Sequence, residues 1–239
     1  MTTSTQKSAY WAGVRDGAPF LFVAGPFAML FGLLAAEAGL NAYEALAFSI
    51  VVIAGAAQFT ALQLMQENVP TFIVLASALA VNLRLAMYSA SITPYIGAAP
   101  VWQRALAAYF LVDQTYASAI GRYEAQPDMT VPERMAYFAG VSTSVCPGWY
   151  IFTVVGALVG AQIPEAWALD FALPLAFLAM ISPLLRTPAH MVAALVAIVV
   201  SLMATNIPYS LGLLVAGICG MVAGAQAELW FERRKQRAI

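Results

Sequence analysis

The stretch PTFIVLASALAVNLRLAMYSASI, residues 70–92, decides the class of fold. It is long and apolar enough to cross the hydrocarbon core of a bilayer as one helix, which takes about 20 residues. Arg84 interrupts the stretch, and a charge near mid-bilayer costs about 2.5–3.5 kcal/mol on insertion scales. Such a charge persists where it faces protein or water. The stretch therefore predicts a membrane helix with one polar face directed into a bundle.

The composition of the whole chain supports an all-α integral membrane protein. Of its 239 residues, 62% are hydrophobic and 10% are charged, whereas soluble domains carry about 25% charged residues. The net charge is −1, and no basic patch interleaved with aromatic residues predicts nucleic acid as a partner. His190 is the single histidine, which argues against a histidine metal cluster, and the motifs of common hydrolases and nucleotide-binding enzymes are missing. We expect a lipid bilayer around the chain, no cofactor and no enzymatic activity.

Apolar segments predict a bundle of about eight transmembrane helices in one transport domain. The fourth segment is the weakest because it contains Asp113 and Gln114, and the seventh is short, so seven helices are the alternative. The segments cover residues 19–39, 45–64, 71–92, 103–121, 135–160, 167–185, 189–204 and 209–227.

The basic residues favour eight crossings with both termini in the cytoplasm. In that topology nearly all Lys and Arg residues lie on the cytoplasmic side, as the positive-inside rule requires. Arg104 alone falls outside. The polar connector at residues 122–134 divides the chain into halves, 19–121 and 135–227, that would share one orientation. FGLLAAEAGL (31–40) and VGALVGAQIP (155–164) are similar at nearly equivalent positions, which indicates either a weak internal repeat or chance likeness between apolar runs.

Pro26 and Pro147 each lie beside a glycine early in the first predicted helix of a half. A proline inside a helix removes a hydrogen bond and can break the helix. We therefore predict broken helices near both prolines, whose free ends would hold the charged groups of a solute. Ser144, just before Pro147, is a candidate contact for the solute. The simpler interpretation is a kink without a ligand.

Arg84 shares a helix face with Tyr88 and Ser91, which follow it at helical spacing. Asn82 lies two residues away and faces another direction. A polar stripe on a membrane helix is directed into the bundle. Arg84 could bind a carboxylate, gate a pathway, or form a structural pair with an aspartate.

Asp113 lies inside another apolar run and shares a face with Tyr109 and Tyr116. If it has no cationic partner, its carboxyl group could carry protons in coupled export. If Arg84 is its direct partner, the carboxylate stays ionised and that role weakens. The sequence leaves both interpretations open.

Gln58 follows the small residues Ala54, Gly55, Ala56 and Ala57. Small residues allow close packing of helices, and this structural interpretation is the stronger one. Gln58 is also a candidate to line the solute pathway.

Four stretches together resemble the AzlC family. They are AGAAQFTALQL (54–64), VNLRLAMYSASI (81–92), YFLVDQTYA (109–117) and LDFALPLAFLAM (169–180). The chain departs from the family pattern at Leu85, where a histidine is common, and at Gln114, where an acidic residue is common. The resemblance implies pathway roles for Gln58, Asn82, Arg84, Tyr88 and Asp113.

The resemblance also implies an exporter of branched-chain amino acids in the bacterial inner membrane. Its solutes would be leucine, isoleucine and valine, with methionine as a further candidate, and a small AzlD-like membrane subunit would be its partner. Without an ATP site, export would be secondary-active, with protons as the expected coupling ion. The alternatives are a scaffold or sensor subunit that transports nothing, and a passive channel for small solutes.

Overall fold

The computed structural model describes residues 2–160, 185, 187–204 and 211–236. This part of the chain is all-α, as predicted. Two compact units can be separated, one comprising residues 1–62 and 81–169 and the other residues 63–80 and 170–239. The first unit contains the predicted polar residues. The predicted sixth helix, 167–185, lies outside the described residues except for Leu185, and so does most of the motif at 169–180.

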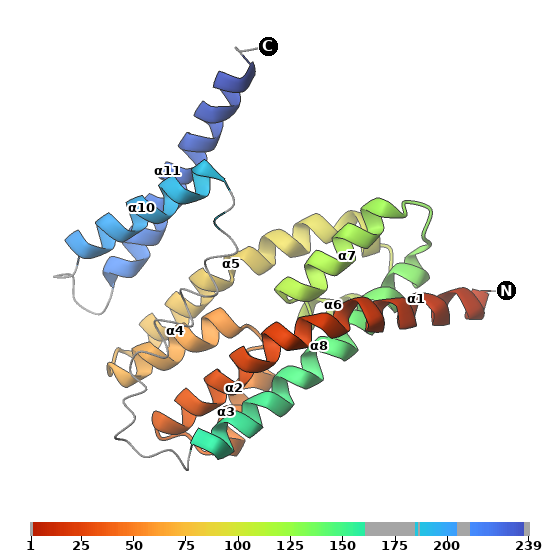
Figure 1. The fold of residues 1–239 in the computed structure, drawn as a ribbon, viewed down its shortest axis with the longest axis horizontal. Coiled ribbons are helices and arrows are strands. Elements are labelled where there is room, and N and C mark those ends of the chain that lie inside the picture. Colours follow the sequence, from red (N-terminus) through yellow and green to blue (C-terminus); the bar gives the residue numbers. More distant parts are fainter. Residues whose placement is uncertain (1, 161–184, 186, 205–210, 237–239) are drawn as a thin grey trace. The chain divides into compact units, whose positions relative to one another are not determined.

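The predicted apolar segments that the structure describes are mainly helical (Figure 1). Within the described residues, three helical runs are long and apolar enough to cross a membrane: Gln6–Glu37, Thr71–Ile96 and Val131–Gly160. The elements are α1 (Thr2–Gly17), η1 (Ala18–Phe20), α2 (Leu21–Glu37), α3 (Ala42–Val51), α4 (Gly55–Gln66), α5 (Thr71–Ile96), α6 (Val101–Tyr109), α7 (Asp113–Ala125), α8 (Val131–Gly160), α10 (Pro188–Met203) and α11 (Leu211–Gln236).

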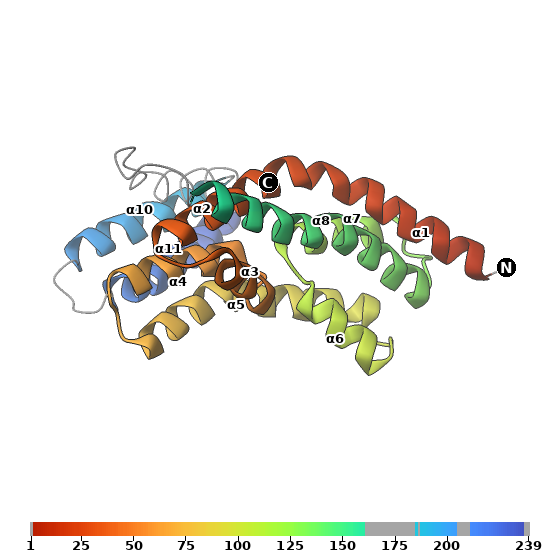
Figure 2. The ribbon, with the colours of Figure 1, turned by 90° about the horizontal axis from the view of Figure 1, so that it is seen from below.

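The run α1–η1–α2 packs parallel to α8 along its length (Figures 1 and 2). Gly13 lies directly against the Tyr137 carbonyl, and Gly32 lies against the Thr153 carbonyl. A side chain at either glycine would collide with the backbone of α8. Small residues therefore allow the two helices to approach closely. The contacts advance in the same direction along both helices, which makes the pair parallel.

Pro26 and Pro147 do not break their helices, so this prediction was wrong. The helix α2 continues through Pro26, and α8 continues through Pro147. The parallel packing persists at their level, because Gly25 lies against Phe152 and Gly148 lies against Leu21. Both proline rings are on exposed faces. Close packing on the opposite face holds each helix together across the missing hydrogen bond.

The chain breaks instead at residues 52–54, in the middle of the predicted helix 45–64. Phe48 on α3 and Phe59 on α4 both pack edge-on against Phe31, with ring centroids 5.5 and 5.7 Å away. On one straight helix, two residues eleven positions apart would be separated by about 16 Å. The chain therefore reverses at the break, and residues 42–62 form a helical hairpin, named hairpin 1 below.

A second break occurs at residues 110–112, in the middle of the predicted helix 103–121. The helix α7 runs parallel to α5, since Arg84 pairs with Asp113 and Tyr95 packs against Tyr123. The helix α6 follows α5 after the link 97–100 and runs back along it, where the two helices line a shared groove. Consequently α6 and α7 are antiparallel, and residues 101–125 form hairpin 2.

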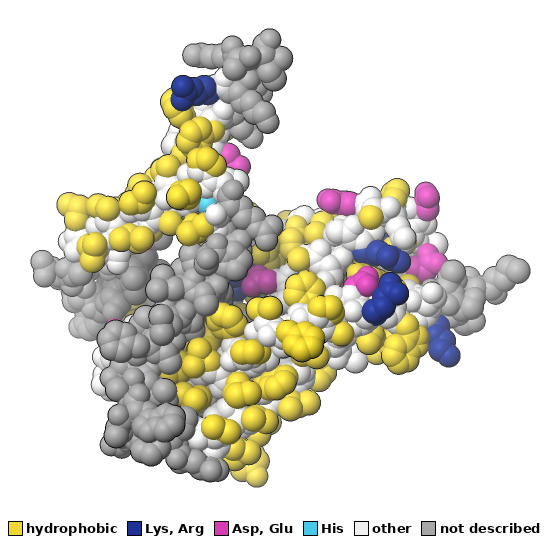
Figure 3. Space-filling view, in the orientation of Figure 1, with side chains coloured by type: hydrophobic (Ala, Val, Ile, Leu, Met, Phe, Trp, Pro, Cys, Tyr) yellow, Lys and Arg dark blue, Asp and Glu magenta, His cyan; other side chains and the backbone are white. Residues whose placement is uncertain are grey.

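The two hairpins enter the first unit from opposite ends. Hairpin 1 follows the C-terminal end of α2. Hairpin 2 follows the C-terminal end of α5, which lies beside the start of α8 because Arg134 of α8 donates to the Tyr95 carbonyl of α5 (3.2 Å). The helix α1, which is parallel to α8, begins at this same end. Neither hairpin crosses the unit, so the predicted crossings at 45–64 and 103–121 are corrected to hairpins. Arg104 accordingly lies at the end that carries Lys7 and Arg15, where Figure 3 shows Lys and Arg side chains gathered.

The described part of the second unit contains the helical pair α10 and α11. Small residues line its interface, with Gly220 against Ala193 and Ala197. The predicted halves, 19–121 and 135–227, remain a prediction.

Candidate solute and ion site

An ion pair joins α5 to the tip of hairpin 2. The Nη1 atom of Arg84 lies 3.1 Å from Oδ2 of Asp113, and the two side chains are 28% and 41% exposed. Asp113 is the first residue of α7. Unpaired backbone N–H groups and the helix dipole favour a carboxylate at that position. The structure thus pairs the two charges directly, which is the alternative in which the proton-carrying role of Asp113 weakens.

Aromatic side chains cover one side of this pair. The ring of Tyr88 stacks on that of Tyr116, with centroids 4.1 Å apart and planes 6° apart. Tyr88 interacts electrostatically with both Asp113 and Arg84. The Tyr116 hydroxyl donates to Ser91 Oγ at 2.9 Å. The face predicted for Arg84, Tyr88 and Ser91 is therefore the face that meets α7.

The ion pair leaves part of its hydrogen-bonding capacity unused. Two buried atoms of the pair, Arg84 Nε and Asp113 Oδ1, have no hydrogen-bond partner among the described residues, and Asn82 Oδ1, two residues before Arg84 on α5, also has none there. Buried polar atoms in folded proteins nearly always have partners. Asp113 can thus accept a further hydrogen bond, such as one from an ammonium group, and Arg84 can donate one to a carboxylate.

Gln58 belongs to a second polar cluster, inside hairpin 1. Its Nε2 donates to Ser49 Oγ at 2.9 Å, and Ser49 Oγ lies 3.1 Å from Thr153 Oγ1 of α8. All three side chains are fully buried. The cluster ties both halves of the hairpin to α8, which agrees with the packing role favoured from the sequence.

The tips of the two hairpins are linked by a tyrosine. The Tyr109 hydroxyl, at the end of α6, donates to the Ile50 carbonyl near the end of α3 at 2.6 Å. It also lies 3.1 Å from the Tyr150 hydroxyl of α8. The sequence placed Tyr109 beside Asp113 and missed this contact. Only a predicted break after Ile50, which frees carbonyl groups there, could have indicated it.

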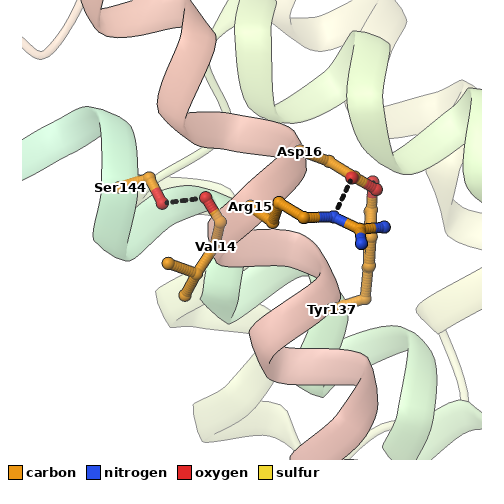
Figure 4. Close-up of polar contacts among 5 residues, drawn as sticks. All are labelled: Val14, Arg15, Asp16, Tyr137 and Ser144. Carbon is orange, nitrogen blue, oxygen red and sulfur yellow. Dashed lines mark hydrogen bonds and ion pairs between the residues drawn. The ribbon is translucent and has the colours of Figure 1, made fainter.

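Three predicted residues lie elsewhere in the first unit. The Ser144 hydroxyl donates to the Val14 carbonyl (2.8 Å) and contacts the Gly140 carbonyl (3.2 Å), so it fastens α8 to α1 (Figure 4). Pro26 is exposed on α2. Pro147 lines an apolar groove of about 530 Å³ between α6 and α8. The structure does not join these residues to the ion pair or to the Gln58 cluster.

Comparison with known proteins gives one family and one relative. The family model described as AzlC protein matches residues 19–163, which include both hairpins and the ion pair. The chain is also 25% identical over 233 residues to "Inner membrane protein YgaZ" of Escherichia coli (strain K12), covering 94% of this chain and 93% of that protein. No solved structure matches the chain.

Proposed function

Because the chain belongs to the AzlC family, whose members are membrane transport proteins, we propose that it exports branched-chain amino acids by secondary-active transport. The solutes are leucine, isoleucine and valine, with methionine as a further candidate. The proposal places the protein in the inner membrane with both termini in the cytoplasm, beside a small AzlD-like subunit. The family resemblance supports this partner, and the basic residues at the end where α1 begins support this orientation.

The observation that carries the proposal is the Arg84–Asp113 ion pair at the tip of a hairpin. Discontinuous helices that end within a membrane protein are typical of solute and ion sites in transporters. The zwitterionic head of an amino acid needs few polar groups, while aliphatic walls suit its side chain. The pair offers both charges and has unused hydrogen-bonding atoms.

In this mechanism Asp113 carries the proton only while its ion pair with Arg84 is parted, because the direct pair seen in the structure weakens the role of Asp113 as a proton carrier. A proton on its carboxyl group neutralises the partner of Arg84 and weakens the ion pair. Loss of that proton on the other side of the membrane restores the pair and returns the hairpin to its starting position. Proton movement down its gradient thereby drives solute movement against its own.

Efflux from proteoliposomes tests the proposal. The chain is reconstituted with and without its small partner, loaded with labelled leucine, and given an imposed pH gradient. We expect saturable, gradient-dependent efflux, and its loss in Arg84→Ala at normal protein level. Arg104→Ala, which removes an arginine outside the site, is the control and should retain efflux.

The alternatives give different results in the same preparation. A passive channel would give leucine flux that neither saturates nor responds to pH. A scaffold subunit would tolerate exchange of the two charges, so that Arg84→Asp combined with Asp113→Arg would fold and support its complex. Efflux unchanged in Arg84→Ala would reject the proposed site.

A further inference from the structure

An apolar groove follows hairpin 2 from its base to its tip. It lies between α6 and α8 and has a volume of about 530 Å³. It begins beside Trp102 and Pro132, the second residues of these two helices. It ends beside Phe110, which begins the break at 110–112 and lies three residues before Asp113. The groove therefore leads from the end of the unit that we propose to be cytoplasmic to the hairpin tip that carries the ion pair.

The walls of this groove suit an aliphatic solute. Its volume lies within the range of about 300–1,000 Å³ that is typical of small-molecule sites. No charged side chain occurs among the described residues that line it, and its apolar walls include Leu106, Ala107, Phe110, Met135, Phe138 and Ala139. A solute with a charged side chain would lose hydration there without gaining a partner.

Pro147 leaves a backbone acceptor free in the inner part of the groove. Proline has no N–H group, so the carbonyl of Thr143, four residues earlier on α8, lacks its usual donor within the helix. Both residues line the groove, and both are exposed. Although Pro147 does not break α8, it thus provides the groove with a carbonyl that can accept a hydrogen bond from a solute.

The hydroxyl groups next to this carbonyl are also limited to accepting. The Ser142 hydroxyl donates to the Phe138 carbonyl at 2.9 Å, and the Thr143 hydroxyl donates to the Ala139 carbonyl at 2.7 Å. Each hydroxyl hydrogen is therefore used within α8, whereas the oxygen atoms can still accept. This part of the groove favours a donor such as an ammonium group and disfavours a carboxylate.

We propose that the groove between α6 and α8 is the cytoplasmic entrance for the solute, and that the Thr143 carbonyl binds the ammonium group of an apolar α-amino acid there. The aliphatic side chain lies against the walls, and the carboxylate remains free for Arg84 at the next site. This inference rests on the proposed function and deepens it. An exporter must collect its solute from the cytoplasm before the solute reaches the Arg84–Asp113 pair.

Pro147→Ala tests the ammonium site, because it supplies the missing N–H group, which then donates to the Thr143 carbonyl within α8. In proteoliposomes of the full chain with its partner, we expect the KM for leucine efflux to rise about tenfold, the effect of losing a hydrogen bond to a charged group. The midpoint of thermal unfolding in detergent should stay the same or rise, since the helix gains a hydrogen bond. A proline that only shapes the helix would change this midpoint and leave the KM unchanged.

Pro26→Ala is the matched control. Pro26 is also an exposed proline inside a continuous helix, α2, but it does not line this groove. The substitution should leave the KM for leucine at the wild-type value. A monodisperse elution profile in detergent confirms that each variant folds.

A cysteine at Ala139 tests the entrance without measuring transport. Ala139 lines the groove, whereas Ile151 is an exposed residue of α8 that does not line it and lies about equally far from the middle of that helix, on the other side. Maleimides react with thiols that water can reach and ionise. We expect a membrane-impermeant maleimide to label Ala139→Cys, and saturating leucine to slow this labelling several-fold. Ile151→Cys should stay at the background set by the wild-type protein, because lipid surrounds it.

The outcomes separate the entrance from the proposed function. If the wild-type protein transports leucine but Pro147→Ala keeps its KM, or leucine does not slow the labelling of Ala139→Cys, the entrance is wrong and the proposed function stands. Ala139→Cys that stays as unreactive as Ile151→Cys would mean that lipid fills the groove. Labelling that occurs only without the small partner would mean that the partner covers it, and either result overturns the inference. If the wild-type protein shows no saturable leucine efflux, the proposed function itself fails.

Discussion

Hairpins 1 and 2 share a backbone plan and differ in their chemistry. Each consists of a half-helix, a break at residues 52–54 or 110–112, and a second half-helix, and each follows a long helical run after a short link. They enter from opposite ends, an arrangement typical of inverted repeats in transporters. At the tip of hairpin 2 the chain supplies its own carboxylate, whereas the first turn of α4 in hairpin 1 has no acidic residue. Similar geometry thus places an ion pair at the tip of hairpin 2 and an uncharged, buried polar cluster inside hairpin 1.

The strongest test of this division is Asp113→Asn. The amide has nearly the shape of the carboxylate but cannot carry the proton, so efflux driven by a pH gradient should fall to the level of protein-free liposomes. Exchange of leucine for leucine without a gradient should continue, because Arg84 and the amide oxygen can still bind the head group of the solute. Asp16→Asn removes a carboxylate that accepts from Tyr137 at 3.0 Å, away from the tips, and should leave coupling intact. Gradient-driven efflux that survives in Asp113→Asn would remove the difference between the hairpins.

A second test concerns what fixes each tip. The Thr115 hydroxyl is fully buried, accepts from the Val112 N–H at 2.9 Å and donates to the Phe110 carbonyl at 2.8 Å. Thr115→Val leaves these buried groups unpaired, at a cost of about 1–3 kcal/mol. We expect the midpoint of thermal unfolding in detergent to fall by several degrees.

Thr60→Val is the matched change in hairpin 1. The Thr60 hydroxyl only donates to the Ala56 carbonyl within its own helix (2.9 Å), so its loss should alter stability by less than about 0.5 kcal/mol. Equal effects of the two variants would mean that hairpin 2 is not held at its tip by Thr115.

The sequence predicted the helices and the faces of the polar residues because both depend on local periodicity. The stripe of Arg84, Tyr88 and Ser91 follows from helical spacing alone, and the structure places it against α7. Four short stretches of sequence also indicated the AzlC family, and the family model confirms this prediction. Periodicity could not predict which helix each polar face contacts.

The breaks were missed for a physical reason. Val52, Ile53 and Ala54 are as apolar as their neighbours, so two half-helices at 45–64 satisfy the same length criterion as one crossing helix. The prolines led to a wrong prediction because each one destabilises its helix at a single turn, whereas the packing of α2 on α8 stabilises both helices over many turns. One signal of the true arrangement was present, since Arg104 lay on the wrong side in the eight-helix topology.

The smallest expected effect concerns the contact that joins the hairpins. Tyr109→Phe removes the hydroxyl that donates to the Ile50 carbonyl at 2.6 Å, a hydrogen bond whose net contribution is about 0.5–1.5 kcal/mol. If this bond must break for the two tips to part during transport, its loss should raise the maximal rate of leucine efflux about two- to tenfold with little change in KM. Tyr43→Phe, at a tyrosine of α3 that is 85% exposed, should leave the rate unchanged. A slower Tyr109→Phe variant would show that the contact belongs to the open or transition form, and that the two tips move together rather than part.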